Sequence, residues 1–171
     1  TLALALQMAR ARVPDDTAEL AGMLDRATDE LERGLAELRE LARGIHPTVL
    51  TEDGLAAAIG ALAERSAVPT SIAVPDRLFE PAVEATAYYV VAEALTNIAR
   101  YAGETTATVS LTHDGSTLRV EIHDEGRGGA VASRGSGLQG LGDRVAAVGG
   151  TFLVDSPAGG GTTIRADIPC A

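Results

Sequence analysis

The stretch DEGRGG, residues 124–129, decides the fold together with three others: EALTN at 93–97, GSGLQG at 135–140 and GGGTT at 159–163. Each of these segments is common on its own. In this order they supply a helix with a Glu/Asn pair, an acid at the end of a strand, a flexible loop that opens a helix, and a tight turn before a late strand. Such a set is suited to a nucleotide with its metal ion.

The residues around these segments predict an α+β domain with a mixed, mostly antiparallel sheet. Pro81 suits the first turn of the helix that carries EALTN, and the apolar stripe of this helix is formed by Val91, Leu95, Ile98 and Ala102. Strict alternation of apolar and polar residues predicts the strands. The predicted elements are, in order, a capped helix over 51–63, a strand over 70–74, the helix from Pro81, a hairpin of 106–112 and 118–123, a helix that ends near Val148, and strands over 151–154 and 162–168.

The first 46 residues predict a helical hairpin. Leu24, Leu31 and Leu38 stand at every seventh position, and Pro14 interrupts the helical pattern before them. An apolar seam with a period of about 3.5 residues favours packing against other long helices. We therefore expect residues 1–46 to form a two-helix hairpin that dimerises into a four-helix bundle. The alternative is an amphipathic helix that lies on its own domain.

Composition and charge exclude several classes of function. The chain has 171 residues and a formal net charge of -10, which opposes direct binding to nucleic acid or to acidic membranes. Cys170 is the only cysteine, so neither a disulfide framework nor a cysteine metal site is expected. No apolar run reaches the roughly 18 residues of a membrane span. The helical pattern already in progress at Thr1 indicates that upstream residues have been removed. We expect a cytoplasmic location, with membrane contact only through such missing residues.

Glu93 and Asn97 are four residues apart, so on a helix they share one face, which Arg100 continues. One interpretation makes them polar residues that face solvent. In the functional interpretation, the side-chain oxygen of Asn97 is a hard ligand of the kind that Mg2+ prefers. Glu93 would then act as a base or help to orient the attacking group.

Asp124 ends a predicted strand and is followed at once by a glycine-rich loop. A carboxylate in this place can accept a hydrogen bond from the exocyclic amine of adenine, although an aspartate in an ordinary turn has the same local sequence. Gly126 and Gly128 would let the backbone approach a base closely, since neither has a side chain. Backbone N–H groups at the start of the next helix, over 137–140, would face phosphate groups.

The chain resembles the cytoplasmic core of bacterial sensor histidine kinases, whose ATP-binding fold is shared with gyrase, Hsp90-type chaperones and mismatch-repair ATPases. Residues 93–101 are similar to the asparagine box of that family, 124–128 to its first glycine box and 135–140 to its second. The leucine-rich hairpin and the RGIHP junction at 43–47 resemble the compact subfamily that pairs with helix-turn-helix response regulators.

The resemblance implies two domains: a dimerisation hairpin over 1–46 with a truncated first helix, and an ATP-binding catalytic domain, an α/β sandwich, over 47–171. It implies ATP and Mg2+ as cofactors, with Asn97 as a Mg2+ ligand and Glu93 as an aid to phosphoryl transfer and a second candidate ligand. Tyr101 departs from the histidine often found at its position. The residues that the resemblance places at the nucleotide are Asn97, Arg100 at a phosphate, Tyr101, Asp124 at the adenine amine, Gly126, Gly128, Gly135, Gly137, Leu138, Gly140, and Thr162 near the base.

The resemblance also implies a reaction, in which the γ-phosphoryl group of ATP passes to a histidine and then to an aspartate of a response-regulator receiver domain. His46 precedes Pro47, whereas the acceptor of the family is similar to a histidine followed by an acid in the first hairpin helix. We therefore expect the acceptor to lie upstream of Thr1, with His46 as the weaker candidate. This chain would then bind ATP without phosphorylating itself. His113 and His123 fall in the predicted β-hairpin.

Two other functions remain open at this point. GSGLQG at 135–140 also satisfies the dinucleotide-binding pattern, and Asp155 follows about 20 residues later at a strand end. Against that enzyme class, no further strand-helix-strand units follow in the sequence. The second alternative is a degenerate ATPase-fold scaffold that only dimerises and docks a partner.

Overall fold

Buried and exposed side chains alternate along three neighbouring strands, as a sheet covered on one face requires. These strands are β2 (Ala107–His113), β3 (Thr117–Asp124) and β5 (Thr162–Pro169) of a computed structural model that describes residues 48–130 and 136–170. The buried positions of all three strands are mainly aliphatic, and the exposed positions are mainly polar. One face of the sheet therefore packs on helices, and the opposite face is polar.

The sheet has five strands in the order β1-β2-β3-β5-β4. Its two edges are β1 (Thr70–Ala73) and β4 (Thr151–Asp155). Within the described residues, the β1–β2 pair is parallel and the other three pairs are antiparallel. The predicted mixed, mostly antiparallel sheet is thus confirmed.

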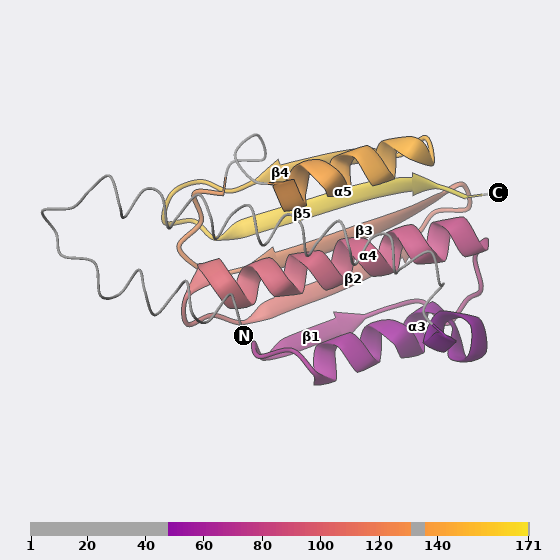
Figure 1. The fold of residues 1–171 in the computed structure, drawn as a ribbon, viewed down its shortest axis with the longest axis horizontal. Coiled ribbons are helices and arrows are strands. Elements are labelled where there is room, and N and C mark those ends of the chain that lie inside the picture. Colours follow the sequence, from indigo (N-terminus) through magenta and orange to yellow (C-terminus); the bar gives the residue numbers. More distant parts are fainter. Residues whose placement is uncertain (1–47, 131–135, 171) are drawn as a thin grey trace, which may run out of the picture. The chain divides into compact units, whose positions relative to one another are not determined.

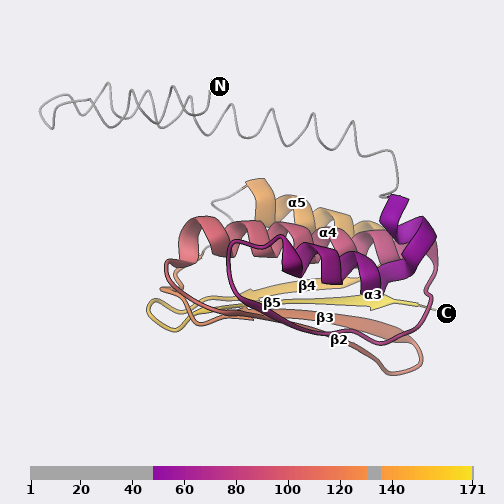
Figure 2. The same cartoon turned by 90° about the horizontal axis from the view of Figure 1, so that it is seen from below.

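Helices α3 (Thr48–Glu64), α4 (Pro81–Asn97) and α5 (Ser136–Ala147) cover one face of the sheet (Figure 1). Seen along the plane of the sheet, helices and strands form two separate layers (Figure 2). The aliphatic core lies between the two layers. Its largest fully buried side chains are Leu55, Ile59, Leu118, Ile122, Ile168, Val90, Val91, Val109, Val120 and Val145.

The elements predicted for this domain are confirmed in type and order, with bounds that differ by a few residues. Helix α3 begins at Thr48, three residues before the predicted start. Gly54 interrupts this helix with a φ of 77° and a ψ of 178°. A left-handed φ of this kind is readily adopted by glycine alone, so Gly54 marks a break between a short first turn and the main helix.

The end of α4 differs from the prediction. The apolar stripe of this helix predicts continuous α-helix as far as Ala102. The structure instead has a π-helical turn, η1 (Ile98–Ala102), and the chain leaves it at Gly103. A π-helical turn holds more residues than an α-helical one, so the α-helical spacing that placed Arg100 on the face of Asn97 ends at Asn97 itself.

Several predictions concern residues outside the part of the chain that the structure describes. They are the helical hairpin over 1–46, the domain boundary at 46/47, the candidate acceptor His46, and Gly135. Within the described ranges, no helix is long and apolar enough to cross a membrane.

The strand order also bears on the dinucleotide alternative. Helix α5 follows β3 and precedes β4, but these two strands are not neighbours, because β5 lies between them. A dinucleotide fingerprint works in a unit whose glycine-rich loop joins a strand directly to a helix, with neighbouring parallel strands on either side. The described sheet has no such unit around α5, so it gives this alternative no support.

Candidate nucleotide-binding site

Asp124 lies at the end of β3 on the inner face of the sheet. It continues the buried alternation that includes Leu118 and Ile122, and its exposed fraction is 3%. In the sheet its Cα is paired with Ala107 on one side and Thr162 on the other. A buried carboxylate is costly unless hydrogen-bond donors face it. The structure therefore places an acid and a hydroxyl side by side at the end of the core.

One donor to Asp124 comes from its own loop, since the Gly126 N–H donates to Oδ1 at 2.8 Å. The second oxygen, Oδ2, takes no part in that bond, so the carboxylate can hold the loop and a ligand donor at once. A Cβ at Gly126 would lie 2.6 Å from the Cβ of Ala102. Glycine is required here because the loop packs directly onto the end of η1.

Arg127 joins the same loop to η1 by two hydrogen bonds. Its backbone N–H donates to the Ala102 carbonyl at 3.2 Å, and its Nε–H donates to the Tyr101 carbonyl. Carbonyl groups at the end of a helix lack partners within the helix, and a cation there is favoured by the helix dipole. Sequence reasoning missed Arg127, because an arginine between two glycines gives no periodic signal.

Gly128 and Gly161 have φ values of 60° and 73° and lie where two loops meet. A Cβ at Gly128 would collide with the Pro157 carbonyl, and a Cβ at Gly161 would collide with the carbonyl of Asp124. The sequence predicts that Gly126 and Gly128 leave room for a base. In the structure Ala102 and the Asp124 carboxylate lie beside Gly126, and backbone carbonyls lie beside Gly128, so both glycines are needed for packing of the loop.

Helix α5 brings the second glycine segment to α4. A Cβ at Gly137 would lie 2.5 Å from Oε1 of Glu93, so the half-buried carboxylate lies against the first turn of α5. The positive end of the helix dipole favours a negative group at this place. The sequence predicts phosphate groups here, and in the structure the acid beside the helix start is Glu93.

Asn97 is the last residue of α4, one helical turn after Glu93 and on the same side of the helix. It is half-buried, and η1 follows it directly. Arg100 and Tyr101 lie within η1 and are exposed, Tyr101 to 55%. π-helical turns occur frequently at functional sites, where the additional residue changes the direction of neighbouring side chains.

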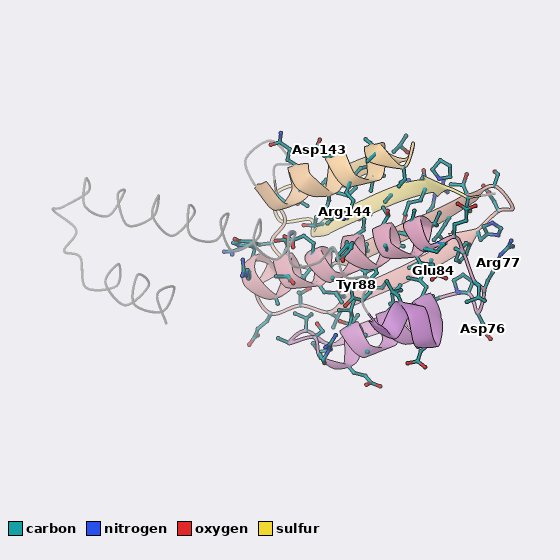
Figure 3. All side chains as sticks on the ribbon, turned by 45° about the vertical axis from the view of Figure 1, so that its right-hand side comes forward. Asp76, Arg77, Glu84, Tyr88, Asp143 and Arg144 are labelled. Carbon is teal, nitrogen blue, oxygen red and sulfur yellow. The ribbon has the colours of Figure 1, made fainter. Side chains whose placement is uncertain are left out.

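Three further residues of α5 have different surroundings. Leu138 packs against the hydrophobic core, whereas nothing lies within 4 Å of a Cβ built at Gly140. Figure 3 shows Arg144 on the side of α5 that faces α4, and its guanidinium carbon lies 4.5 Å from the ring centroid of Tyr89. This cation–π contact links the two helices that carry the asparagine and second glycine segments.

The donor set of the site fits a magnesium ion that arrives with a nucleotide. Asn97 and Glu93 offer oxygen atoms on successive helical turns. Mg2+ is held in proteins by one or two such oxygens and completes its shell with water and phosphate. Within the described ranges, no group of three or more His, Cys, Asp or Glu residues could hold a metal ion.

Four segments thus meet at one end of a two-layer α/β domain, an arrangement that defines a nucleotide-binding ATPase fold. The family model described as "Histidine kinase-, DNA gyrase B-, and HSP90-like ATPase" matches residues 82–171, which contain all four segments. This chain belongs to that family. The resemblance to the ATPase domain of sensor histidine kinases, expected from the sequence, is confirmed.

Curated relatives are sensor histidine kinases. The sensor histidine kinase MctS of Rhizobium johnstonii is 33% identical over 177 residues, which cover 96% of this chain and 38% of MctS. The oxygen sensor histidine kinase NreB of Staphylococcus carnosus is 28% identical, over 91% of this chain and 46% of NreB. The chain therefore spans less than half the length of these relatives.

Solved structures show the same fold. The histidine kinase domain of the EL346 blue-light activated histidine kinase from Erythrobacter litoralis aligns with a TM-score of 0.61, over 98% of this chain and 92% of that domain, at 19% identity. The mycobacterial sensor histidine kinase MprB aligns with a TM-score of 0.52 over 68% of this chain, at 21% identity.

Proposed function

We propose that this chain is the ATP-binding and catalytic part of a sensor histidine kinase, which binds Mg-ATP and transfers the γ-phosphoryl group to a histidine. The observation that carries the proposal is the convergence of the four family segments. Asp124 is paired with Thr162, the loop after Asp124 packs on η1, and Gly137 lies against Glu93. Separate segments of the sequence thus supply the groups for a base, for phosphates and for a metal at one end of the domain.

The base is recognised by the buried end of β3. Asp124 accepts a hydrogen bond from the 6-amino group of adenine, and Thr162 lies beside the base. Because Asp124 is 3% exposed, such a bond forms in a region of low dielectric constant, where it is stronger than in water. Arg100 and the backbone N–H groups of α5 contact phosphates.

Phosphoryl transfer depends on the two polar residues of α4. Asn97 would hold Mg2+, and Glu93 is the second candidate ligand. A bound Mg2+ would neutralise charge on the phosphate groups. Glu93 orients the attacking histidine or takes its proton, and Tyr101 lies at the exposed rim. Positioning and charge neutralisation supply most of the rate enhancement in such a site.

The remaining parts of the proposal concern the whole kinase. Residues 1–46 form the dimerisation hairpin, and the phosphoacceptor histidine lies upstream of Thr1. The phosphoryl group then passes to an aspartate of a response-regulator receiver domain. The chain works in the cytoplasm and does not contact nucleic acid itself, in keeping with its net charge of -10.

Calorimetric titration with ATP tests the nucleotide site. We expect one ATP per chain, bound more tightly with Mg2+ than without it. Asp124→Asn should weaken ATP binding by about 10-fold or more, because a hydrogen bond to a charged group is lost. The variant should stay folded, since an asparagine oxygen can still accept the Gly126 N–H. Undiminished ATP affinity in Asp124→Asn would contradict the assignment.

Incubation with γ-labelled ATP and Mg2+ tests the location of the acceptor. We expect no acid-labile phosphate on this chain, and a phosphorylated His46 would refute that part of the proposal. Asn97→Ala separates a kinase from a scaffold. In a chain extended upstream to include the acceptor, a kinase loses Mg2+-dependent labelling on this substitution, whereas a scaffold keeps its dimer and loses nothing measurable.

A further inference from the structure

Arg127 joins three segments at the end of the domain where the site lies. Its side chain donates from Nε to the Tyr101 carbonyl, and its backbone N–H donates to the Ala102 carbonyl at 3.2 Å. Its own carbonyl accepts the Gly159 N–H at 2.7 Å. Arg127 thus lies between η1, which follows Asn97 directly, and the turn before β5.

The side chain of Arg127 is not needed to attach the loop. The bond to Ala102 and the bond from Gly159 are both made by backbone groups, so they remain when the arginine is replaced. The loop also packs on η1 through Gly126, because a Cβ there would lie 2.6 Å from the Cβ of Ala102. Arg127 is exposed, so its side chain adds little to the core. Among the described residues, what this side chain contributes is the bond to the Tyr101 carbonyl.

That bond acts on the part of η1 that the core does not hold. Ile98 is 5% exposed and Ala102 packs against the core, so packing holds the two ends of the π-helical turn. Arg100 and Tyr101 lie between them and are exposed. Because the chain leaves the helix after Ala102, later residues do not supply helical donors to the last carbonyls. The Nε–H of Arg127 therefore bonds a carbonyl that the helix itself leaves without a partner.

The form of this turn decides the direction in which Arg100 leaves the helix. In an α-helix, Arg100 would stand three residues after Asn97 and on the same face. A π-helical turn closes over five residues in place of four, so the residues within it are rotated relative to those before it. The direction of Arg100 relative to Asn97 is thus set by the π-helical form.

We propose that Arg127 is a positioning residue, whose bond to the Tyr101 carbonyl holds η1 in the π-helical form and thereby directs Arg100 toward the phosphates of ATP. This inference rests on the proposed function, in which Arg100 contacts a phosphate and Asp124 contacts the base. Asp124 accepts the Gly126 N–H at 2.8 Å, a bond within its own loop that does not involve the Arg127 side chain. Loss of that side chain should therefore weaken binding of the phosphates and leave binding of the base as it was.

Calorimetric titration of the 171-residue chain with Mg-ATP, together with an NMR titration with adenosine, tests the proposal. Arg127→Met keeps an unbranched side chain but no donor. Its Mg-ATP affinity should fall by about 3- to 10-fold, because a charge-assisted hydrogen bond to phosphate is weakened. Its adenosine affinity should not change. Arg127→Lys keeps a cation that can bond a carbonyl at a helix end, so it should keep most of the Mg-ATP affinity.

Arg119→Met is the matched control. Arg119 is also an exposed arginine, but it lies on the outer face of the sheet and pairs with Asp167 at 2.7 Å. Its replacement removes the same charge from the chain and should change neither affinity. An equal loss of Mg-ATP affinity in Arg119→Met and Arg127→Met would make net charge the cause and would overturn the proposal.

A double-mutant cycle shows whether Arg127 acts through Arg100. In Arg100→Met, the further change Arg127→Met should leave the Mg-ATP affinity where Arg100→Met puts it, since the group that Arg127 positions is gone. Additive losses would mean that Arg127 acts on the nucleotide by itself. Additive losses, or an unchanged Mg-ATP affinity in Arg127→Met, would overturn the positioning role while Mg-ATP binding by the wild type still supports the proposed function. A wild type that does not bind Mg-ATP would overturn both.

NMR of the same variant separates this role from a general loosening of the loop. In Arg127→Met, the amide of residue 127 keeps the Ala102 carbonyl as its acceptor, and the Gly159 amide keeps the carbonyl of residue 127, so neither should exchange faster with solvent. The backbone chemical shifts of residues 98–102 should change, because the turn loses its π-helical form. Faster exchange at both amides would mean that the whole loop opens, and the positioning role would then be withdrawn.

Discussion

Glu93 and Gly137 belong to different helices, and they meet because one of them has no side chain. The space that a Cβ of Gly137 would fill is occupied by the carboxylate of Glu93, which lies against the first turn of α5. The acid therefore lies at a helix start, where the positive end of the helix dipole favours a negative charge. At the scale of the residue, the site depends on the close approach of Gly137 to Glu93 as much as on its polar groups.

Gly137→Ala should weaken Mg-ATP binding without unfolding the domain. The new Cβ would lie 2.5 Å from Oε1 of Glu93, and the flexible carboxylate would move away from it. We expect about a tenfold loss in Mg-ATP affinity, because small displacements of positioned groups are costly. Thermal stability should stay within about 1 kcal/mol, since alanine favours a helix. Calorimetry and thermal melts measure both effects.

Gly60→Ala is the matched control for this substitution. Gly60 also lies inside a helix, and a Cβ there would make only an ordinary contact, 3.9 Å from Ile72. It should leave nucleotide affinity unchanged. If Gly60→Ala and Gly137→Ala reduced the affinity equally, the contact with Glu93 would not be the cause.

The polar residues of the site could be named from the sequence, but the residues that hold its loops could not. Glu93 and Asn97 share a helical face by spacing, and Asp124 follows an alternating strand, so both patterns are local. Arg127 and Ser156 bond mainly to backbone groups of distant segments. No periodicity in the sequence reports such contacts.

At the scale of the element, the β2–β3 hairpin shows a turn held by one side chain. Asp114 Oδ1 accepts the backbone N–H groups of Ser116 at 3.1 Å and Thr117 at 2.9 Å. Both bonds lower the pKa of Asp114 below its ordinary value of 3.8, and the bond from Ser116 has the larger effect. The ionised form therefore stabilises the turn.

Removal of Asp114 should destabilise the chain in a pH-dependent way. Because the folded-state pKa is lowered, the contribution of this carboxylate is present above its ordinary value of 3.8 and is lost as the pH falls through the lowered value. Asp114→Ala should thus have a lower urea midpoint than the wild type at pH 7, and the difference should shrink below about pH 4.

Asp114→Asn serves as the control in the same urea titrations. It keeps an oxygen that can accept the two N–H groups but carries no charge, so its midpoint should fall between those of the other two proteins at pH 7. A difference in urea midpoint between the wild type and Asp114→Ala that stays constant from pH 7 to about pH 3 would contradict the role of the ionised carboxylate.

Element types and order followed from periodicity, whereas the end of α4 did not. The stripe from Val91 to Ala102 has α-helical spacing, yet the last turn is the π-helical η1. The hydrogen bonds that Arg127 donates to the Tyr101 and Ala102 carbonyls come from another part of the chain. Tertiary contacts of this kind decide how a helix ends and override local preference.

At the scale of the whole molecule, the two faces of the sheet have different chemistry. The inner face carries the core and ends at Asp124, while the outer face is polar and has ion pairs such as Arg119–Asp167 at 2.7 Å. A hollow of about 410 Å³ also lies on that face, lined by Glu121, His123, Leu153, Asp155, Thr163 and Arg165. This hollow lies on the face opposite the buried side chain of Asp124, and the proposed function requires the inner face.

Amide chemical-shift mapping with Mg-ATP tests the convergence of the four segments most directly. The account predicts that one saturable set of shifts appears at Asn97, Gly126, Gly137 and Thr162 together, with none centred on Leu153 of the outer face. Shifts confined to the outer hollow, or spread over unconnected surfaces without saturation, would contradict it.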